Sequence, residues 1–376
     1  MKNILFISCT RVFGGAEYVL CDYIKRNRYN NNMYIYTTDR KEVRNKYINI
    51  FPKENTFFSD KMDAISIRKN TLKSIIYIIF NLFYINKLVK RYKIDILYGN
   101  NTIDMVIIAL YKKYMNKKIK TISHIHDILE AKYIKFFIKN FNIFIDIFIV
   151  PSMVTKKSLL SCNIKNEKIN VVYNGIDVNE ISNSSYLIKN LIDKKYDRRI
   201  KLIFVGQFCK RKRPDMFIDI INNLNNKNKK YLGIVIGKVI DREYFNFVKE
   251  KKCDDIIFLG ELERELILDL YRSIDALILT SDRDPLPTVI LEAMSRGTIV
   301  IARDVDGVSE IIENNKNGYI FKYDDSVPQI ANFIEDIMVK PKNIKEIVKN
   351  NAKERIKKFF KLENKIKQIN NLLEDD

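Results

Sequence analysis

Two carboxylates in the stretch SDRDPLPTVILEAMSRG (281–297) are spaced so that they could bind one ligand. Asp284 stands in a loop after an apolar run, and Glu292 lies inside a helix that should start at Pro287. Thr288 and Glu292 are four residues apart and share one face of that helix. Carboxylates accept hydrogen bonds from sugar and ribose hydroxyls, and the first amides of a helix suit a pyrophosphate, so a nucleotide-sugar offers all three groups. The alternative is structural: Asp284 caps the helix and Glu292 is exposed.

A basic loop precedes a second predicted helix, which starts near Pro214. Cations together with exposed helix amides form a phosphate site. The alternative is an ordinary solvated loop. Because a predicted strand ends at Gly206 directly before the loop, we favour the phosphate site. Its cations are Lys210, Arg211, Lys212 and Arg213.

A Gly-Gly pair separates the first predicted strand from the helix that follows it, in RVFGGAEYVL (11–20). Glycine lets a backbone approach a ligand closely, and the helix N-terminus favours anions. A tight turn that only leads into the helix explains the pair equally well. The pattern is not G-x-G-x-x-G, so it does not support a dinucleotide site.

The two histidines of the chain, His124 and His126, stand two residues apart in SHIHD. On a strand they would share a face. They could form a metal pair with Asp127, but we find no third strong ligand of that kind and expect no metal. We favour His126 as a hydrogen-bonding group in a cleft at the carboxyl end of the strand, and His124 as a satisfied, partly buried side chain.

Short apolar runs alternate with amphipathic segments in two series. This alternation indicates two doubly wound α/β domains with parallel sheets, which bind ligands at the carboxyl ends of their strands. We place the boundary in the polar stretch 176–199 and predict one long charged helix over 352–376. The first series has strands at 3–8, 32–38, 95–100, 121–127, 147–152 and 169–175, with helices at 15–27, 71–92 and 129–145; the second has strands at 201–207, 231–237, 255–261, 275–281 and 298–304.

Composition sets the broad class. The 376 residues are 47% hydrophobic, which is enough for two cores, and the five cysteines show no paired spacing, as suits a reducing compartment. The net charge of +20 suggests nucleic acid or an anionic membrane as a partner, but no nucleic-acid motif is present. The start MKNILFIS reads as a buried strand and not as a signal peptide. The apolar window SIIYIIFNLFYINKLV, interrupted by Asn81 and Asn86, reads as too short for a membrane span.

Taken together, these motifs resemble those of the retaining glycosyltransferases of family 4, which have the GT-B fold. The resemblance covers nearly the whole chain, and its most specific segment, 284–321, resembles the family's E-x(7)-E motif. It implies two Rossmann-like domains facing a central cleft: 1–177 for the acceptor and 178–376 for the nucleotide-sugar donor, with a terminal helix, about 352–376, that can pack back on the first domain. The other matching motifs are FGGAE, HIHD, VVYNGID and FVGQFCKRKRPD.

The resemblance also assigns roles to the paired carboxylates and their neighbours. Glu292 matches the second glutamate of the motif, which holds the ribose. Asp284 matches the first, which contacts the donor sugar, and is one methylene shorter. In DVDGVSE, Asp306 replaces one of two expected glycines and Gly307 remains. The donor site is completed by Gly206, Leu286, Pro287 and Thr288.

The phosphate contacts follow from the same resemblance. Lys212 matches the lysine that neutralises the donor pyrophosphate, and Gln207 stands where the family has an arginine. Arg211 or Arg213 could supply the missing charge. Gly15 matches the loop glycine next to the phosphates, and His126 matches a histidine near the donor sugar. The catalytic residues are therefore expected to be Lys212, Asp284 and His126.

The resemblance implies transfer of a hexose-type sugar from a nucleotide donor to an acceptor hydroxyl with retention, without a metal or other cofactor. The expected partners are the nucleotide-sugar, a glycan or lipid-linked acceptor of surface polysaccharide or glycolipid synthesis, and no nucleic acid. The expected location is cytoplasmic. Two alternatives stand beside this reading: a non-catalytic GT-B-like binding or assembly subunit, and a nucleotide-sugar epimerase on the same fold.

A basic helix raises the question of an anionic membrane surface as a further partner. Lys132, Lys135 and Lys139 recur on one face of EAKYIKFFIKNFNIF, with aromatic residues nearby. Such a face could dock on the inner side of the cytoplasmic membrane. The alternative is that the aromatics pack in the core and that the lysines reflect composition only. The aromatics concerned are Phe136, Phe137 and Phe141.

Overall fold

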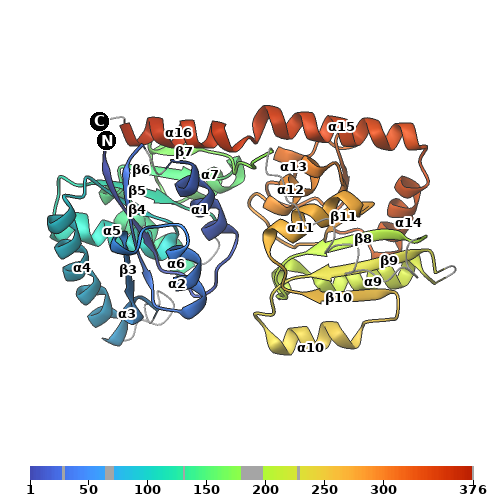
Figure 1. The fold of residues 1–376 in the computed structure, drawn as a ribbon, viewed down its shortest axis with the longest axis horizontal. Helices are drawn as coiled ribbons and strands as arrows, with labels where there is room; N and C mark the ends of the chain where they lie inside the picture. Colours follow the sequence, from blue (N-terminus) through green and yellow to red (C-terminus); the bar gives the residue numbers. More distant parts are fainter. Residues whose placement is uncertain (28–29, 64–71, 130–131, 179–197, 227–228, 375–376) are drawn as a thin grey trace. The chain divides into compact units, whose positions relative to one another are not determined.

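The computed structural model describes residues 1–27, 30–63, 72–129, 132–178, 198–226 and 229–374. It divides into two compact units: Met1–Gly175 with Leu362–Asp376, and Ile176–Lys361 (Figure 1). Most of the predicted boundary stretch, 176–199, lies outside the described residues. Each unit has one fully parallel sheet with helices, which confirms the predicted fold class.

The first unit is built on a seven-stranded sheet in the order β3-β2-β1-β4-β5-β6-β7. The chain runs outward from β1 to β3 and then resumes with β4 on the other side of β1, so the topological switch point lies between β1 and β4. Among the strands of this unit only β3 was not predicted from the sequence, and in the second unit the strand at Tyr319–Phe321 was not predicted either. The strands are Asn3–Ser8 (β1), Asn32–Thr38 (β2), Thr56–Ser59 (β3), Ile96–Gly99 (β4), Lys120–His124 (β5), Ile147–Val150 (β6) and Ile169–Val171 (β7).

Helices cover both faces of this sheet, and each face has its own core. Along β1, Leu5 and Ile7 belong to one core and Ile4 and Phe6 to the other, as expected when side chains alternate across a strand. The helices of this unit are Gly15–Asn27 (α1), Lys41–Ile48 (α2), Asp60–Asp63 (α3), Leu72–Tyr92 (α4), Thr102–Tyr114 (α5), Lys132–Phe141 (α6), Met153–Leu160 (α7) and Leu362–Glu374 (α16).

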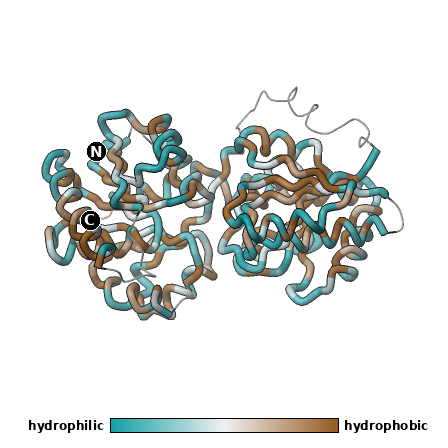
Figure 2. Tube along the Cα trace, turned by 90° about the horizontal axis from the view of Figure 1, so that it is seen from below, coloured by the Kyte–Doolittle hydropathy of each residue, from teal (hydrophilic) through white to brown (hydrophobic). Residues whose placement is uncertain are grey.

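The second unit has a six-stranded sheet in the order β10-β9-β8-β11-β12-β13, with its switch point between β8 and β11. Brown, hydrophobic segments run through the interior of this unit, and teal segments lie on its outside (Figure 2). Its strands are Ile200–Val205 (β8), Tyr231–Ile236 (β9), Ile256–Gly260 (β10), Ala276–Leu279 (β11), Ile299–Arg303 (β12) and Tyr319–Phe321 (β13). Its longer helices are Pro214–Leu224 (α9), Arg242–Glu250 (α10), Arg264–Leu270 (α11), Thr288–Arg296 (α12), Val327–Met338 (α14) and Lys342–Phe359 (α15), and Val308–Ile311 (α13) forms a single turn.

The C-terminal segment is two helices, so the prediction of one long helix over 352–376 is wrong. The helix α15 ends at Phe359 and α16 begins at Leu362. Phe360 between them is only 2% exposed, and its carbonyl accepts the backbone N–H of Ile176 at 2.8 Å. Burial of an aromatic side chain and pairing with a second segment break the helix here, and neither is visible in a charged helical pattern. After the break, α16 joins the core of the first unit through Ile369 and Leu373.

The helix α4 is longer and more apolar than the sequence analysis allowed. The helix has 21 residues and contains an apolar 18-residue window, so by length and composition alone it could cross a membrane. The expectation that this segment is too short for a span is therefore wrong. A buried core helix passes the same test, and one third of the apolar window is buried in the unit.

Candidate functional site

In the second unit, the loops after the two switch-point strands bring Lys212 and Asp284 together. Lys212 follows β8 and Asp284 follows β11, and these strands are neighbours in the sheet. The Lys212 Nζ and Asp284 Oδ2 atoms are 2.5 Å apart, and both side chains are largely buried. Two residues that are 72 positions apart in sequence thus form one ion pair at the carboxyl edge of the sheet. This edge is where open α/β sheets bind their ligands.

Backbone contacts hold the two loops side by side. The Thr280 hydroxyl bonds to the carbonyls of Lys212 and Arg213, at 3.2 and 2.8 Å. The Asp282 N–H donates to the Arg211 carbonyl at 2.8 Å. Arg211 in turn donates through Nη1 to the carbonyl of Arg283. The position of Lys212 is therefore set by backbone hydrogen bonds and does not depend on its ion pair alone.

A third loop, which follows β12, holds Asp284 in place by hydrogen bonds. An Asp306 carboxylate oxygen accepts the Asp284 N–H at 2.8 Å, and the same carboxylate pairs with Arg283 at 3.0 Å. The Gly307 N–H points back to the Asp284 carbonyl at 3.3 Å. A Cβ on Gly307 would come within 1.9 Å of the Pro285 carbonyl oxygen, so only glycine fits there. Asp306, which departs from the resembled family's glycine, thus has a structural role in this chain.

Glu292 is buried, which contradicts the alternative that it is exposed on its helix. It is 8% exposed and lies on α12, where its Oε1 accepts from Arg264 Nε at 2.8 Å. Arg264 opens α11, and the sequence analysis missed it, because one arginine in a charged stretch carries no signal of a buried partner. A carboxylate has lone pairs for about four hydrogen bonds.

Two helices begin next to these charges, and neither has a side-chain cap. The helix α9 begins at Pro214 after Arg213, whose φ of 53° places it in the left-handed region. The helix α12 begins at Thr288 after Pro287. The first amides of a helix lack intrahelical partners, so such an end can receive an anion. In α9 fewer amides are available than in α12, because Pro214 has no N–H. The Met216 N–H bonds to the Arg213 carbonyl at 3.1 Å. Leu286 is buried and Thr288 half-buried in the same loop, and Gly206 and Gln207 are half-buried at the end of β8.

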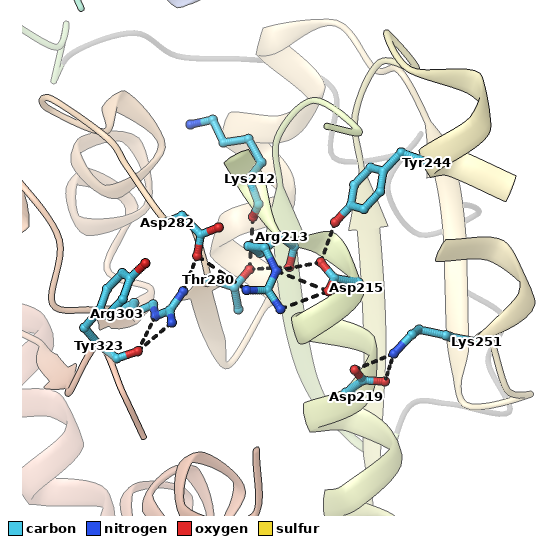
Figure 3. A network of polar contacts seen from close by, with 10 residues as sticks. All are labelled: Lys212, Arg213, Asp215, Asp219, Tyr244, Lys251, Thr280, Asp282, Arg303 and Tyr323. Atoms are coloured by element: carbon cyan, nitrogen blue, oxygen red, sulfur yellow. Dashed lines mark hydrogen bonds and ion pairs between the residues drawn. The ribbon is translucent and has the colours of Figure 1, made fainter. Parts of the chain in front are cut away.

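Arg213 does not lie with Lys212 but enters a separate charge network. Its guanidinium bonds to Asp215 at about 3.0 Å and reaches Asp282, which also pairs with Arg303. Figure 3 shows the Lys212 side chain pointing away from this network. Burial alone would raise the pKa of Asp215, but hydrogen bonds from Arg213 and Tyr244 hold it below its ordinary value. The Arg213 guanidinium is thus paired with carboxylates. We therefore do not expect it to supply the positive charge that is missing at Gln207.

A cavity of about 580 Å³ opens on the α10 side of this network. Its lining combines two cations with four carboxylates and two aromatic rings, and it does not include Lys212. An excess of carboxylates disfavours a pyrophosphate. The cavity is therefore distinct from the edge where Lys212 and Asp284 meet. Its lining residues are Lys210, Arg213, Asp215, Asp241, Glu243, Tyr244, Phe247 and Asp282.

In the first unit, the loop after β1 brings Gly15 and Glu17 to the switch point. Gly15 is the first residue of α1, and a Cβ placed on it would meet no atom within 4 Å. Nothing within the unit therefore requires a glycine, and close approach of a ligand remains the prediction for it. Glu17 is 6% exposed and accepts the Gly14 N–H at 2.9 Å. Burial raises the pKa of Glu17 to about 7.

His126 lies beyond the end of its strand and contacts the loop after β4. Strand β5 ends at His124, yet the two imidazole rings stack with centroids 3.9 Å apart. The His126 Nε2 lies 3.1 Å from Asn100 Oδ1, while the other end of that amide donates to Ala16. This orientation of Asn100 makes Nε2 the protonated nitrogen. Burial, and then the Lys365 charge, lower the pKa of His126 to about 3, so the ring is neutral.

His124 is a core residue, as expected, but it is more deeply buried than predicted and only half satisfied, because its buried Nε2 has no hydrogen-bond partner among the described residues. It is 1% exposed and hydrogen-bonds through Nδ1 to the Tyr98 hydroxyl at 2.8 Å. Lys365 of α16, 3% exposed, donates to the Val19 carbonyl and adds a positive charge near both rings. Among the described residues, no group of three or more His, Cys, Asp or Glu side chains could hold a metal ion.

These features define a two-domain α/β protein whose second unit suits a phosphorylated ligand. Each unit is doubly wound, and each presents polar side chains in the loops after its switch-point strands. The second unit adds a lysine, carboxylates and two uncapped helix N-termini, which together suit a phosphorylated ligand with hydroxyl groups.

Comparison with known families identifies the chain more closely. Residues 190–355 match the model of the glycosyl transferases group 1, and residues 15–180 match that of Glycosyltransferase Family 4. The two matches follow one another along nearly the whole chain. The chain thus carries a segment that matches Glycosyltransferase Family 4 followed by one that matches the glycosyl transferases group 1, on a GT-B fold.

Individual relatives are distant. A glycosyltransferase of Methanocaldococcus jannaschii, MJ1607, is 26% identical over 221 residues, which are 56% of this chain and 55% of that protein. The chain thus spans about half the length of this relative. A Campylobacter jejuni protein is 26% identical over 169 residues, 44% of this chain and 46% of its own; it is named as an alpha-1,4-N-acetyl-D-galactosaminyltransferase for a diNAcBac-PP-undecaprenol-linked glycan.

Solved structures share the fold over the full length. The Anabaena protein Alr3699/HepE, in complex with UDP and glucose, has a TM-score of 0.83 at 19% identity and covers 99% of both chains. At this identity the similarity establishes the GT-B fold and nothing finer.

Proposed function

We propose that this protein transfers a hexose-type sugar from a nucleoside diphosphate donor to an acceptor hydroxyl, with retention of configuration. The observation that carries the proposal is the Lys212–Asp284 pair at the carboxyl edge of the second sheet, beside the first turns of α9 and α12. A cation and helix amides at one place suit a leaving diphosphate, and a carboxylate suits sugar hydroxyls.

The proposed catalysis is electrostatic. When the glycosidic bond to the diphosphate breaks, negative charge grows on the departing phosphate oxygen, and Lys212 and the helix amides stabilise it there. The acceptor oxygen forms the new bond on the face that the diphosphate leaves, and the acceptor proton passes to the departing phosphate. A preorganised cation of this kind contributes in the transition state more than in the ground state. We propose that no metal and no other cofactor takes part.

Glu292 and Asp284 are assigned to the donor's hydroxyl groups. Glu292, held by Arg264, would accept from the ribose, and Asp284, held by Lys212 and the Asp306 loop, would accept from the sugar. In the first unit, neutral His126 offers Nδ1 as an acceptor, because Nε2 faces Asn100. A ring that stays neutral can bond a sugar hydroxyl without adding a charge.

We further propose a glycan or lipid-linked acceptor in surface polysaccharide or glycolipid synthesis, and a cytoplasmic protein at the inner face of the membrane. The support is the lipid-linked acceptor in the name of the Campylobacter relative. It is also the basic composition of the chain, which favours an anionic surface.

The test is turnover of a panel of UDP-, GDP- and TDP-sugars by the purified protein, with and without EDTA. Release of nucleoside diphosphate that EDTA does not reduce supports the proposal, and the anomeric coupling constant of the product reports retention by NMR. Tight binding of a donor without any turnover would favour a non-catalytic subunit. Conversion of one free nucleotide-sugar into its epimer would favour an epimerase.

A further inference from the structure

The exposed face of α4 is the most apolar surface feature of the first unit. The helix runs along the outside of that unit, at the left of Figure 1. Its exposed positions recur at intervals of three and four residues and therefore form one stripe along the helix. Their exposed fractions range from 41% at Phe80 to 75% at Leu72. The stripe consists of Leu72, Ile75, Ile76, Ile79, Phe80 and Phe83.

The opposite face of α4 is fixed in the unit. Leu82, Ile85 and Leu88 belong to the core, and the buried amide of Asn81 accepts a hydrogen bond from the Tyr36 hydroxyl. A helix that crossed a membrane would have to leave these contacts. The helix is thus held lengthwise on the surface, with a polar hydrogen bond and a packed core on one side and a large apolar stripe on the other.

Charge along α4 indicates which partner this face fits. The helix has no acidic residue. One turn after Phe83, the same stripe becomes cationic at Lys87 and Lys90, which are exposed, and Lys73 flanks its other end. Lys61 of α3 places its ammonium 3.4 Å from the centre of the Phe80 ring. Apolar residues with lysines at their edge are typical of helices that lie in the interface of an anionic bilayer.

We propose that α4 is an in-plane membrane helix, whose stripe enters the headgroup region of an anionic lipid bilayer while its lysines bind lipid phosphates. Such a helix buries its apolar face only about 5–10 Å deep and lies parallel to the surface. The inference deepens the proposed function, since it names the partner surface and the element that contacts it. It does not depend on the proposed transfer reaction for its test.

The basic helix α6 is the natural comparison. Of its three phenylalanines, Phe137 and Phe141 pack against the core, and Phe136 is largely exposed. Lys132 and Lys139 are exposed and Lys135 is half-buried. This helix could attract lipid headgroups by charge but has little apolar surface to insert. The two helices therefore predict different behaviour in salt: binding through α6 alone would be lost, whereas binding through α4 would be weakened and retained in part.

The experiment combines sedimentation with vesicles and a fluorescent reporter. The chain has no tryptophan, so Phe83→Trp introduces a single reporter on the stripe. We expect wild type to sediment with phosphatidylglycerol–phosphatidylcholine vesicles and much less with phosphatidylcholine alone. We expect the emission of the introduced indole to shift to the blue on anionic vesicles and to be quenched by brominated acyl chains.

The decisive measurement is vesicle binding by variants with charged residues in the stripe. Ile76→Glu with Ile79→Glu should lower the partition coefficient by at least about tenfold, because two exposed apolar side chains that would enter the bilayer are replaced by charges. The matched control is Ile347→Glu on α15, an exposed isoleucine of the second unit, which should leave binding unchanged. Lys132→Glu with Lys139→Glu on α6 should lower binding by less than the α4 pair. Melting curves and turnover of the soluble donor confirm that each variant is folded.

Three results would overturn the proposal: full vesicle binding by the α4 double variant, emission of the Phe83→Trp protein that does not change on anionic vesicles, or loss of all binding at high salt. A monomer–dimer equilibrium in analytical ultracentrifugation that the α4 substitutions abolish, without vesicle binding by wild type, would assign the face to a second copy of the chain. Donor turnover is a separate readout, so failure of membrane binding and failure of the proposed transferase activity are distinguishable.

Discussion

Both units place polar residues at the carboxyl ends of their strands. These residues are ionised pairs in the second unit, and groups that favour their neutral forms in the first. In the second unit, the loops after β8, β11 and β12 carry full ion pairs: Lys212 with Asp284, and Arg283 with Asp306. In the first unit, the segments after β1 and β5 carry groups that burial drives toward their neutral forms, with the pKa of Glu17 raised and that of His126 lowered. One fold thus supplies one edge suited to an anion and one edge suited to uncharged hydroxyls.

This difference follows from what surrounds each edge. Opposite charges next to a buried carboxylate stabilise its ionised form, whereas an apolar surrounding stabilises the neutral form. The second unit places arginines next to its carboxylates where three adjacent strands end. In the first unit the buried cation is Lys365 of α16, which donates to a backbone carbonyl. Its charge disfavours a second positive charge on His126.

Removing the lysine of the charged edge should have the largest effect. Lys212→Ala should lower kcat by about 100-fold or more while donor affinity changes much less, because the ammonium acts most strongly on the departing diphosphate. Steady-state kinetics with the donor that is turned over measure both quantities. A raised KM with an unchanged kcat would mean that Lys212 binds the donor uniformly and plays no part in departure. Lys349→Ala, on a solvent-facing ion pair of α15, is the matched control.

The second prediction separates ligand binding from structural pairing at Glu292. Glu292→Gln should weaken binding of the nucleoside diphosphate by about 1.5–3 kcal/mol, the cost of a charge-assisted hydrogen bond to the ribose. Arg264→Gln removes the same ion pair from the other side and should weaken binding less. Calorimetric titration measures both affinities. Equal losses in the two variants would show that Glu292 acts only through its pair with Arg264.

The third prediction concerns the neutral edge and its pH dependence. The pKa of Glu17 rises from 4.5 to about 7 on folding, so the protonated form is favoured in the folded state. The resulting stabilisation is complete below about pH 4.5 and is lost as the pH rises through 7. Glu17→Gln should therefore leave the melting midpoint unchanged near pH 4.5 and raise it near pH 8, with a difference of up to about 3 kcal/mol. A variant that melts like wild type at every pH would show that Glu17 is not held neutral.

The smallest effect is expected from adding charge at the end of β8. Gln207→Arg should raise kcat/KM by up to about tenfold, because Arg213 is committed to Asp215 and Asp282 and does not fill this place. Arg213→Gln serves as a control that should not be rescued by the new arginine. Lower activity of Gln207→Arg would indicate that the present loop already carries the charge that the diphosphate needs.

The sequence by itself determined the two-domain parallel architecture and the places where a ligand could bind. Apolar runs such as 3–8 and 201–207 showed the strands because a strand buried on both faces is continuously hydrophobic. The rule that ligands bind after the strands then pointed to the loops that hold Lys212 and Asp284. Three features escaped this reasoning: the strands β3 and β13 were not predicted, and the break at Phe360 depends on a contact with Ile176.

Only the tertiary structure decided the partners of these residues. The sequence named Glu292 but not Arg264, Asp284 but not the brace from Asp306, and Gly15 but not the buried Glu17 two residues later. The same holds for α4, whose apolar pattern was visible but whose division into a packed face and an exposed stripe was not. Pairing and burial arise where segments far apart in sequence meet, and a pattern along one segment contains no information about what will lie against it.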